Sequence, residues 1–294
     1  MIQYPRALTT PPTIIAILTA FNRCASTLDA LASLEISCRN AGVMSQAVLM
    51  DDGSTDGTAQ AVRESYPWTT VLEGDGNLFW NRGMHAAQAH AMTLPHDYLL
   101  WLNDDTRLEP NAITKLIATS AHLTKTDRTL CIVVGATADP ETGQTTYGGD
   151  IAPSRWRPFH YRRLTPGAEP MECHAMNGNI VLIPAGIVRI VGNLDPLFEH
   201  AMGDTDYALR ARRAGFRIYI APGHLGECSG NQVNGTYRDP VVPLSDRWRK
   251  MLSRKGLPFR SWLHFTRRHG GMLWPLYFAW PYFRLLIMQN KSKP

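Results

Sequence analysis

Short apolar runs alternate with longer amphipathic segments along the first 110 residues. Residues 13–19 form one such run, and residues 26–41 carry Leu28, Leu31 and Leu34 at helical spacing. The pattern predicts further strands over 46–50, 69–72 and 96–102, with a helix that begins near Ala59. This order is typical of β-α-β units and predicts a largely parallel sheet covered by helices.

The pattern continues less regularly in the second half of the chain. Strands are predicted over 130–134, 179–183 and 217–220, and a helix over 204–214. Between them, residues 139–175 contain several Pro and Gly and show little periodicity, so we expect an irregular excursion. Long excursions of this kind usually face a ligand or a partner.

Composition narrows the class of protein. The chain has 294 residues, of which 44% are hydrophobic and 19% charged, so it should fold as a globular protein without disulfides. Its five cysteines are scattered and form no C-x-x-C pair, which excludes a zinc knuckle and favours a reducing compartment. Residues 1–6 do not resemble a secretory signal, so we expect a cytoplasmic protein.

The positive charge is concentrated at one end. Residues 245–294 hold eleven Lys and Arg against one Asp, which gives this segment +10 and leaves −5 for residues 1–244 when the total is +5. We therefore expect a main domain over 1–244 and a separate basic segment over 245–294. No nucleic-acid-binding motif accompanies the basic run, so nucleic acid is not an expected partner.

Three acidic pairs fall at or near predicted strand ends, where open α/β sheets bind ligands. They are Asp51 with Asp52, Asp104 with Asp105, and Asp204 with Asp206. Each pair alone could be a solvated turn or a helix cap. However, Asp104 and Asp105 follow a strongly apolar strand, and adjacent carboxylates repel unless a cation joins them. Mg²⁺ or Mn²⁺ would take such oxygens and keep open positions for phosphates, so this pair is a candidate metal and diphosphate site.

Six ordered motifs give the chain a family resemblance over about residues 13–225. They are Thr19-Ala20-Phe21-Asn22-Arg23, residues 51–58 (DDGSTDGT), residues 76–84 (GNLFWNRGM), Asn103-Asp104-Asp105, Asn177-Gly178-Asn179, and residues 203–215 (GDTDYALRARRAG). Together they resemble the inverting family 2 glycosyltransferases of bacterial envelope-polysaccharide type. The resemblance implies the GT-A fold, an α/β fold with a Rossmann-like mixed sheet flanked by helices. It also implies a nucleotide-sugar half over about 13–110 and an acceptor half over about 111–244.

The resemblance implies a set of donor-binding residues. Thr19 and Asp52 would contact the nucleotide base, and Arg23 would lie near the phosphates or ribose. Asp105 would be the direct ligand of a Mn²⁺ or Mg²⁺ cofactor, with Asp104 at the metal or the ribose, and Asn103 stands where the D-x-D motif has its first Asp. His224 is either a third metal ligand or a histidine of a surface loop. The remaining substrate-binding residues expected are Phe21, Asn77, Trp80, Arg82 and Asn179, although Trp80 could equally pack a core loop.

Asp204 is the expected catalytic base. In similar proteins a carboxylate at this position removes the proton from the attacking hydroxyl, and a single displacement inverts the anomeric centre. Many relatives have Glu where this chain has Gly203. An Asp at the start of a helix can also be a cap, so either Asp204 or Asp206 could take that role. We expect Asp206 to be structural or to bind the acceptor.

These residues predict a metal-dependent, hexosyltransferase-like enzyme. It would move a sugar from a UDP or dTDP donor to a hydroxyl of a glycan or a polyprenyl-linked glycan. One alternative is a sugar-nucleotide pyrophosphorylase, but the basic Gly-rich loop expected after its first strand is missing. The other is a non-catalytic protein that binds membrane or a polyanion through residues 245–294. The donor sugar, the acceptor linkage and the oligomeric state are not encoded in these motifs.

The C-terminal segment mixes aromatic and basic residues. Its apolar run over 272–288 has 17 residues, fewer than the ~20 of a spanning helix. Aromatic rings beside Lys and Arg suit the headgroup region of an anionic membrane. We expect peripheral attachment to the cytoplasmic face of the inner membrane. The alternative is a helical subdomain that packs on the main domain or on a second subunit.

Overall fold

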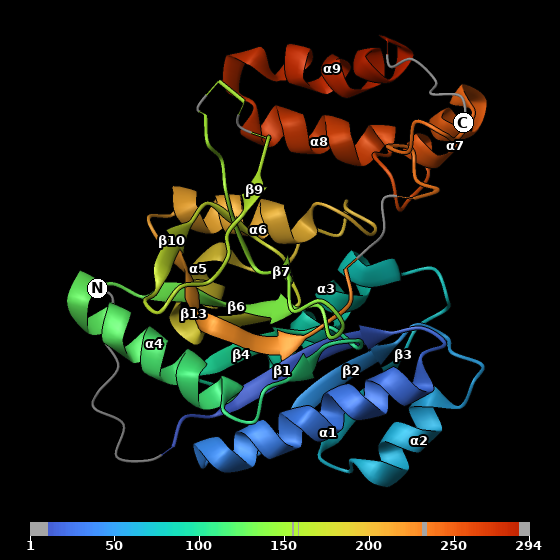
Figure 1. The fold of residues 1–294 in the computed structure, drawn as a ribbon. Helices are drawn as coiled ribbons and strands as arrows, with labels where there is room; N and C mark the ends of the chain where they lie inside the picture. The colour runs from blue at the N-terminus through green and yellow to red at the C-terminus, as the bar shows by residue number, and fades with distance from the viewer. Residues whose placement is uncertain (1–10, 155, 158, 231–233, 288–294) are drawn as a thin grey trace.

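The computed structural model describes residues 11–154, 156–157, 159–230 and 234–287. One half of its main sheet is parallel, as the apolar pattern predicts (Figure 1). The spatial order in this half is β4-β1-β2-β3, and every neighbouring pair is parallel. The strands are β1 (Ile14–Ala20), β2 (Ala47–Asp51), β3 (Thr69–Glu73) and β4 (Tyr98–Leu102). Because they are parallel, their carboxyl ends meet at one edge of the sheet.

The other half makes the sheet mixed. β12 (Ile180–Pro184) runs antiparallel to both β4 and β6 (Cys131–Ala138), and β13 (Arg217–Glu227) runs parallel to β6. Two short strands, β5 (Arg107–Leu108) and β7 (Thr145–Tyr147), pair with β13 and β6. β13 continues seven residues beyond the predicted end at 220, through two irregularities in its pairing with β6.

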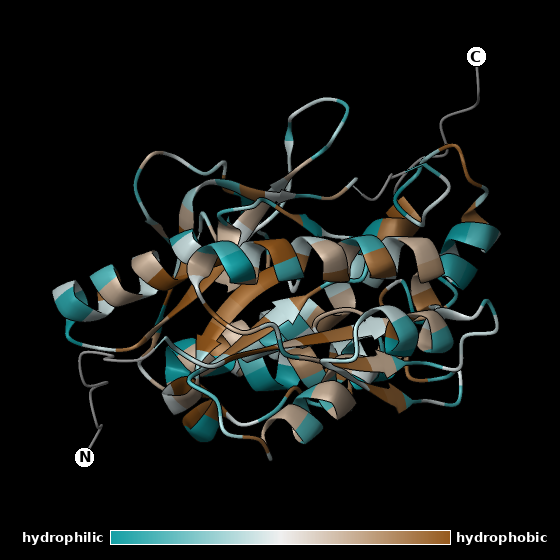
Figure 2. Ribbon diagram, turned by 90° about the horizontal axis from the view of Figure 1, so that it is seen from below, coloured by the Kyte–Doolittle hydropathy of each residue, from teal (hydrophilic) through white to brown (hydrophobic). Residues whose placement is uncertain are grey.

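Helices cover both faces of the sheet. Alternate residues of β1 point to opposite faces, so Ile14, Ala16 and Leu18 join one core and Ile15 and Ile17 the other. The strands therefore lie between two helical layers (Figure 1), and their apolar residues are brown in Figure 2. The first layer contains α1 (Cys24–Ala41), α2 (Thr58–Ser65) and α4 (Ala112–Asp127), and the second α3 (Phe79–Ala91), α5 (Ala185–Val191) and α6 (Gly203–Arg213).

The excursion over 139–175 contains more regular structure than its sequence indicates. β8 (Gly149–Ile151), β9 (Arg162–Arg163) and β11 (Ala175–Met176) form a small antiparallel sheet, and β10 (Met171–Cys173) adds an edge to the main sheet. The expectation of a wholly irregular segment is therefore wrong for these residues. Strands of two or three residues are too short to produce a detectable period.

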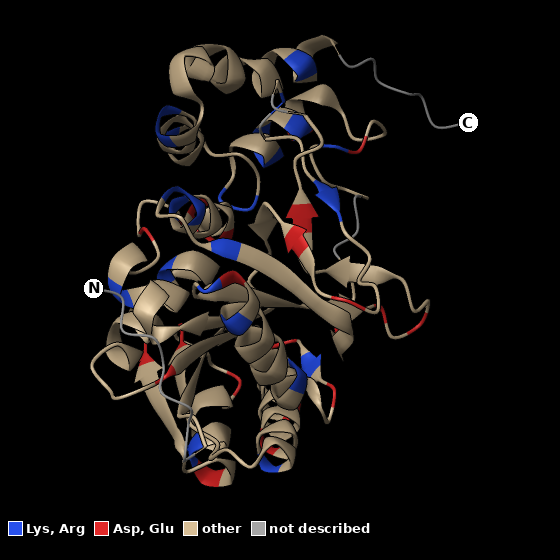
Figure 3. Cartoon of the chain, turned by 90° about the vertical axis from the view of Figure 1, so that its left-hand side faces the viewer, with Lys and Arg blue, Asp and Glu red and all other residues tan. Residues whose placement is uncertain are grey.

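The C-terminal segment is helical and packs beside α6. It comprises α7 (Leu244–Leu252), α8 (Phe259–His269), a 3₁₀ turn (Gly271–Leu273) and α9 (Trp274–Ile287). Trp262 and Phe265 of α8 are buried against Phe198 of the main domain. Lys and Arg stand out along these helices (Figure 3).

Some residues of the sequence argument lie outside the described part of the chain. These are residues 1–6, which bear on a leader, and Met288, Lys291 and Lys293 of the basic segment. Within the described residues, no helix combines the length and the apolar character required to cross a membrane.

Candidate active site

Asp52 follows β2 and holds the loop that leads into α3. Its Oδ1 accepts the backbone N–H groups of Gly76 and Leu78 at 3.0 and 3.2 Å, and its Oδ2 those of Leu78 and Phe79 at 2.9 and 3.0 Å. The residue is buried. A carboxylate has about four acceptor positions, so the loop uses this capacity. The structure thus gives Asp52 a loop-holding role, and its contact with the nucleotide base stays a prediction.

Thr19 and Phe21 lie at the carboxyl end of β1, beside this loop. A Cβ atom on Gly83 would stand 2.2 Å from Thr19 Oγ1, so a glycine there lets α3 approach the strand closely. The side chain of Phe21 is exposed, and its ring lies next to Gly76. The structure therefore brings both residues to the same edge of the sheet as Asp52.

Arg23 joins the two adjacent carboxylates after β4. Its Nη1 contacts Asp104 Oδ1 at 3.2 Å and Asp105 Oδ2 at 2.6 Å. Burial, with the nearby charge of Asp105, raises the pKa of Asp104 to about 7 in spite of the Arg23 charge. Burial is the larger effect because Asp104 is enclosed, while Asp105 is partly exposed. Burial is thus the main reason why Asp104 is difficult to ionise, and a divalent cation at this carboxylate would favour its ionised form.

Trp80 connects this carboxylate turn to the opposite side of the site. Its Nε1–H donates to Asn103 Oδ1 at 2.7 Å, and its ring meets Trp101 edge to face at 6.4 Å. A Cβ atom on Gly178 would lie 2.2 Å from Trp80 Cζ2, so the indole packs directly on the backbone there. Asn179 supports the same turn, since its C=O accepts the N–H of Asn103 at 3.2 Å. The packed position of Trp80 agrees with a core-loop role.

Asn77 and Arg82 do not join the carboxylates. Asn77 is exposed, and its contacts are within the loop, to Asp75. The Nε of Arg82 donates to the C=O of Pro196 at 3.0 Å, and its Nη2 lies 3.5 Å from Glu199. Arg82 therefore anchors the loop that precedes α6.

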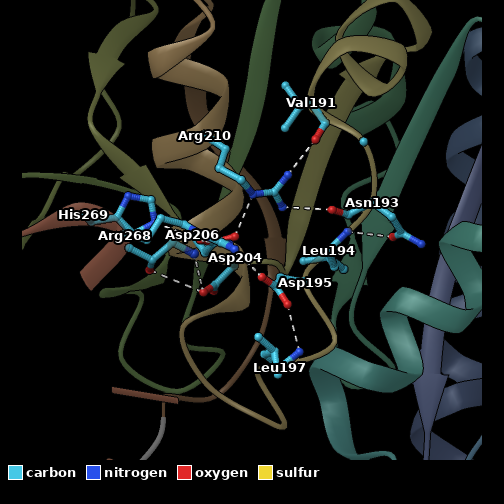
Figure 4. Close-up of polar contacts among 12 residues, drawn as sticks. Val191, Asn193, Leu194, Asp195, Leu197, Asp204, Asp206, Arg210, Arg268 and His269 are labelled. Carbon is cyan, nitrogen blue, oxygen red and sulfur yellow. Dashed lines mark hydrogen bonds and ion pairs between the residues drawn. The ribbon is translucent and has the colours of Figure 1, made fainter. Parts of the chain in front are cut away.

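Asp204 and Asp206 occupy the first turn of α6 (Figure 4). Asp204 Oδ1 accepts the N–H of its neighbour Thr205 at 2.7 Å. Burial raises the pKa of Asp204 to about 6, against backbone hydrogen bonds from Thr205 and Gly178 that lower it. A carboxyl with this pKa is ionised near neutral pH and can accept a proton.

Asp206 is completely buried, and its carboxylate accepts hydrogen bonds from two arginines and a histidine. It accepts from Arg210 Nε at 2.8 Å, from Arg268 Nη1 at 2.9 Å and from His269 Nε2 at 2.8 Å. Although burial raises it, these hydrogen bonds and charges bring the pKa of Asp206 down to about 2. The structure agrees with a structural role for Asp206, because the carboxylate joins α6 to α8.

Gly203 is required by the way α6 begins. A Cβ atom at this position would lie 1.6 Å from Asn81 Oδ1. The Asn81 amide is fixed in turn, because its Nδ2 donates to the C=O groups of Asp195 and Phe198 at 2.8 and 2.7 Å. A larger residue before Asp204 therefore cannot enter without moving α3 or the loop of residues 192–202.

The two sides of the site meet at Gly178. Its backbone N–H bonds to Asp204, and its Cα faces the ring of Trp80, which bonds to Asn103 next to Asp104. A short chain of contacts therefore connects the expected base to the carboxylate pair, although Asp204 lies 99 residues after Asp105 in the sequence.

His224 lies apart from the carboxylate pair. Its Nε2 bonds to Thr145 Oγ1 at 2.9 Å, and its strand position pairs with Ala136. In the described part of the chain, no group of three or more His, Cys, Asp or Glu is arranged to hold a metal ion. The structure therefore does not bring His224 to Asp105.

The donor set nevertheless fits a hard divalent cation. Such ions are held by one or two protein carboxylates together with substrate phosphates and water. Asp104 and Asp105 supply adjacent carboxylate oxygens, and the Arg23 guanidinium contacts both residues. Two adjacent carboxylates of this kind match the protein part of such a ligand set.

Sequence reasoning missed three features of this region. The thiol of Cys228 donates a hydrogen bond to Asp105, with 3.6 Å between Sγ and Oδ1. Tyr161 has a buried hydroxyl with no hydrogen-bond partner among the described residues. Burial raises the pKa of Tyr161 to about 12, and the charges of Arg212, Asp150 and Asp204 have smaller effects on it. Arg268 and His269 come from α8. No local motif marks these residues, because each reaches the site through long-range packing.

Comparison with known proteins supports one family. Residues 16–181, more than half of the chain, match the family model described as Glycosyl transferase family 2. No curated protein matches the sequence.

Three solved structures share the fold. The first is GalNAc-T7 with UDP, GalNAc and Mn²⁺, at 16% identity and a TM-score of 0.53, covering 76% of this chain and 45% of that chain. The second is TarS from S. aureus, at 11% identity and a TM-score of 0.54, covering 88% and 44%. The third is the mannosyltransferase PcManGT from Pyrobaculum calidifontis with GDP-Man and Mn²⁺, at 16% identity and a TM-score of 0.53, covering 92% and 72%. This chain spans less than half the length of the first two. At these identities the likeness concerns the fold, and it confirms the predicted GT-A architecture.

Proposed function

The chain belongs to glycosyl transferase family 2, and from that membership we propose that it transfers a sugar from a nucleotide diphosphate to an acceptor hydroxyl. The donor is a UDP- or dTDP-sugar, and the acceptor is a glycan, free or linked to a polyprenyl lipid. Complexes of GalNAc-T7 with UDP and of PcManGT with GDP-Man support a nucleotide donor for this fold.

The observation that carries this proposal is the contrast between Asp204 and Asp206. Asp206 is neutralised by three partners and cannot accept a proton near neutral pH. Asp204 is held only by hydrogen bonds from backbone N–H groups and from its neighbour Thr205, and burial raises its pKa to about 6. Of the two carboxylates, Asp204 therefore has the properties of a general base.

In the proposed reaction Asp204 accepts the proton of the attacking hydroxyl. The acceptor oxygen forms a bond to the anomeric carbon while the bond from that carbon to the donor diphosphate breaks. The nucleoside diphosphate leaves with the bonding electron pair, and the anomeric centre inverts in this single step. Trp80 packs on Gly178 and donates to Asn103, and these contacts fix the position of the base relative to the carboxylate turn.

The donor lies against the ends of β1, β2 and β4 in this proposal. Thr19 and Phe21 face the nucleotide, and the loop held by Asp52 forms its floor. Asp104 and Asp105 would hold a divalent cation, which neutralises charge on the departing diphosphate when it is bound. Arg23 lies beside both carboxylates and would add a positive charge next to the diphosphate.

We further propose that residues 245–294 attach the enzyme to an anionic membrane, at the cytoplasmic face. The inner side of α9 packs on α7 through Tyr282 and on α8 through Phe278, and Leu285 is buried. Its outer side leaves large apolar residues exposed: Leu276 at 67%, Trp280 at 55%, Phe283 at 53% and Leu286 at 56%. An apolar helix face beside many Lys and Arg supports a lipid surface as the occupant.

A release assay tests the transferase proposal. The enzyme is incubated with UDP- and dTDP-sugars, Mn²⁺ and a short polyprenyl-type acceptor, and nucleoside diphosphate release is followed. We expect acceptor-dependent release that Asp105→Ala abolishes and that Asp29→Ala, an exposed carboxylate on α1, leaves unchanged. NMR of the product then reports inversion. Release that is insensitive to Asp105→Ala would contradict the proposal.

A further inference from the structure

A pocket of about 340 Å³ lies outside the donor site, between the loop before α6 and the beginning of α8. Its polar lining includes Arg82 from α3, Glu199 from the loop, and Arg254 and Arg260 from the C-terminal segment. Its apolar lining includes Leu197 and Phe259, whose side chains are 58% and 53% exposed. Three parts of the chain, each more than 50 residues from the next, thus build one cavity.

The charge of this pocket is positive. Glu199 bridges two of the arginines, with Oε1 at 3.5 Å from Arg82 Nη2 and Oε2 at 2.9 Å from Arg254 Nε. Arg260 is exposed and has no partner among the described residues. Three guanidinium groups against one carboxylate leave two positive charges in excess. Arginine forks match the oxygens of phosphate groups, so a phosphate or diphosphate is the anion that this lining suits.

The rim of the pocket suits an apolar chain. Leu197 and Phe259 lie exposed beside the guanidinium groups, and Phe259 also packs edge to face on Phe278 of α9 at 4.9 Å. An apolar path therefore leads from the pocket toward the helix that carries the exposed apolar face. A ligand with a charged head and a hydrocarbon tail matches both linings.

The pocket adjoins the proposed reaction site on two sides. The Arg254 guanidinium lies 4.8 Å above the ring of Phe79, whose N–H bonds to Asp52. Glu199 lies five residues before Asp204, on the loop that enters α6. An anchor bound here would hold the attached acceptor close to the base.

We propose that this pocket binds the phosphate or diphosphate of a lipid-linked acceptor. The inference rests on the proposed transferase function and specifies the chemical class of its acceptor. It assigns Arg260 and Arg254 to the anchor phosphates and Phe259 with Leu197 to the first part of the lipid chain.

Calorimetric titration of the full chain with geranyl diphosphate tests this assignment. Inorganic diphosphate and geraniol serve as the head-only and tail-only probes. Arg260→Gln removes a positive charge of the pocket that has no ion-pair partner among the described residues. Arg249→Gln is the matched control, because Arg249 is 83% exposed on α7, pairs with Asp246 and lies outside the pocket. Mn²⁺ is present throughout, so Asp105→Ala removes a donor-side carboxylate that would hold a metal for the probe phosphates and shows whether the probe binds there instead.

We expect geranyl diphosphate to bind more tightly than either fragment, and about tenfold more weakly to Arg260→Gln. Arg249→Gln and Asp105→Ala should bind like the unaltered chain. Equal weakening by Arg260→Gln and Arg249→Gln, loss of binding in Asp105→Ala, or equal binding of geraniol would each overturn the assignment. Sugar transfer is measured in parallel. Binding without transfer in any donor assay contradicts the proposed function, whereas transfer unaffected by Arg260→Gln contradicts only the pocket assignment.

Discussion

Asp204 and Asp206 lie two residues apart in the first turn of α6, yet their carboxyl groups have opposite environments. Asp206 is fully buried among Arg210, Arg268 and His269, and its pKa falls to about 2. Burial raises the pKa of Asp204 to about 6. Two neighbouring carboxylates thus divide the work: one fixes the helix and the other remains available to accept a proton.

Activity should depend on pH in the acid range. The base must be ionised, so kcat should fall by about tenfold per pH unit once the pH drops below the Asp204 pKa of about 6. A rate profile from pH 5 to 9 checks this. Asp104, whose pKa burial raises to about 7, should affect donor binding, so donor affinity is measured over the same range. A kcat that stays constant down to pH 5 would contradict the role of Asp204.

Stability should depend on Asp206. Its folded pKa of about 2 lies below the ordinary value of 3.8, so its ionised form stabilises the fold above pH 4 and this contribution disappears toward pH 2. Asp206→Asn removes the buried carboxylate that Arg210, Arg268 and His269 share, and it should lower the free energy of unfolding by about 3 kcal/mol at pH 7. Urea denaturation measures this. Asp204→Asn is the control and should not destabilise the fold; equal losses for the two variants would refute the division of roles.

Nucleoside diphosphates should stabilise the folded protein in the presence of Mn²⁺. A ligand that binds only the folded form raises the melting temperature. We expect UDP or dTDP to give a metal-dependent increase, and Asp105→Ala to remove the metal dependence. Equal stabilisation by ADP and GDP without metal would argue against a pyrimidine donor.

Membrane binding should depend on the outer face of α9. Flotation with anionic vesicles measures it, and Trp280→Ser combined with Phe283→Ser should abolish it, because these exposed side chains would enter the lipid interface. Ile36→Ser, at an exposed apolar position of α1, is the matched control. Flotation that is independent of anionic lipid and of the double variant would disprove the attachment.

Much of the fold could be predicted from local patterns. The apolar run over 13–19 is β1 within one residue at each end, and the run over 96–102 contains β4. Both strands are buried on two faces, and this environment selects continuous apolar residues. The same reasoning could not find β8, β9 or β11, since strands of two or three residues depend on their neighbours for stability.

The site was only partly predictable for a related reason. The order of the acidic motifs located Asp104, Asp105 and Asp204, because each follows or begins a regular element. It could not show that the Asp52 carboxylate binds the loop before α3, or that His269 reaches Asp206 from 63 residues away. Those contacts depend on how the helices pack, and they produce no periodic pattern in the sequence.

The most direct test of the central claim is the rate of sugar transfer by Asp204→Asn at saturating donor and pH 8, with donor affinity measured on the same preparation. The substitution keeps the shape of the side chain and removes its capacity to accept a proton. We predict that kcat falls by about 10²- to 10⁴-fold while donor affinity is unchanged. A variant that transfers sugar at close to the unaltered rate would contradict the assignment of Asp204 as the base.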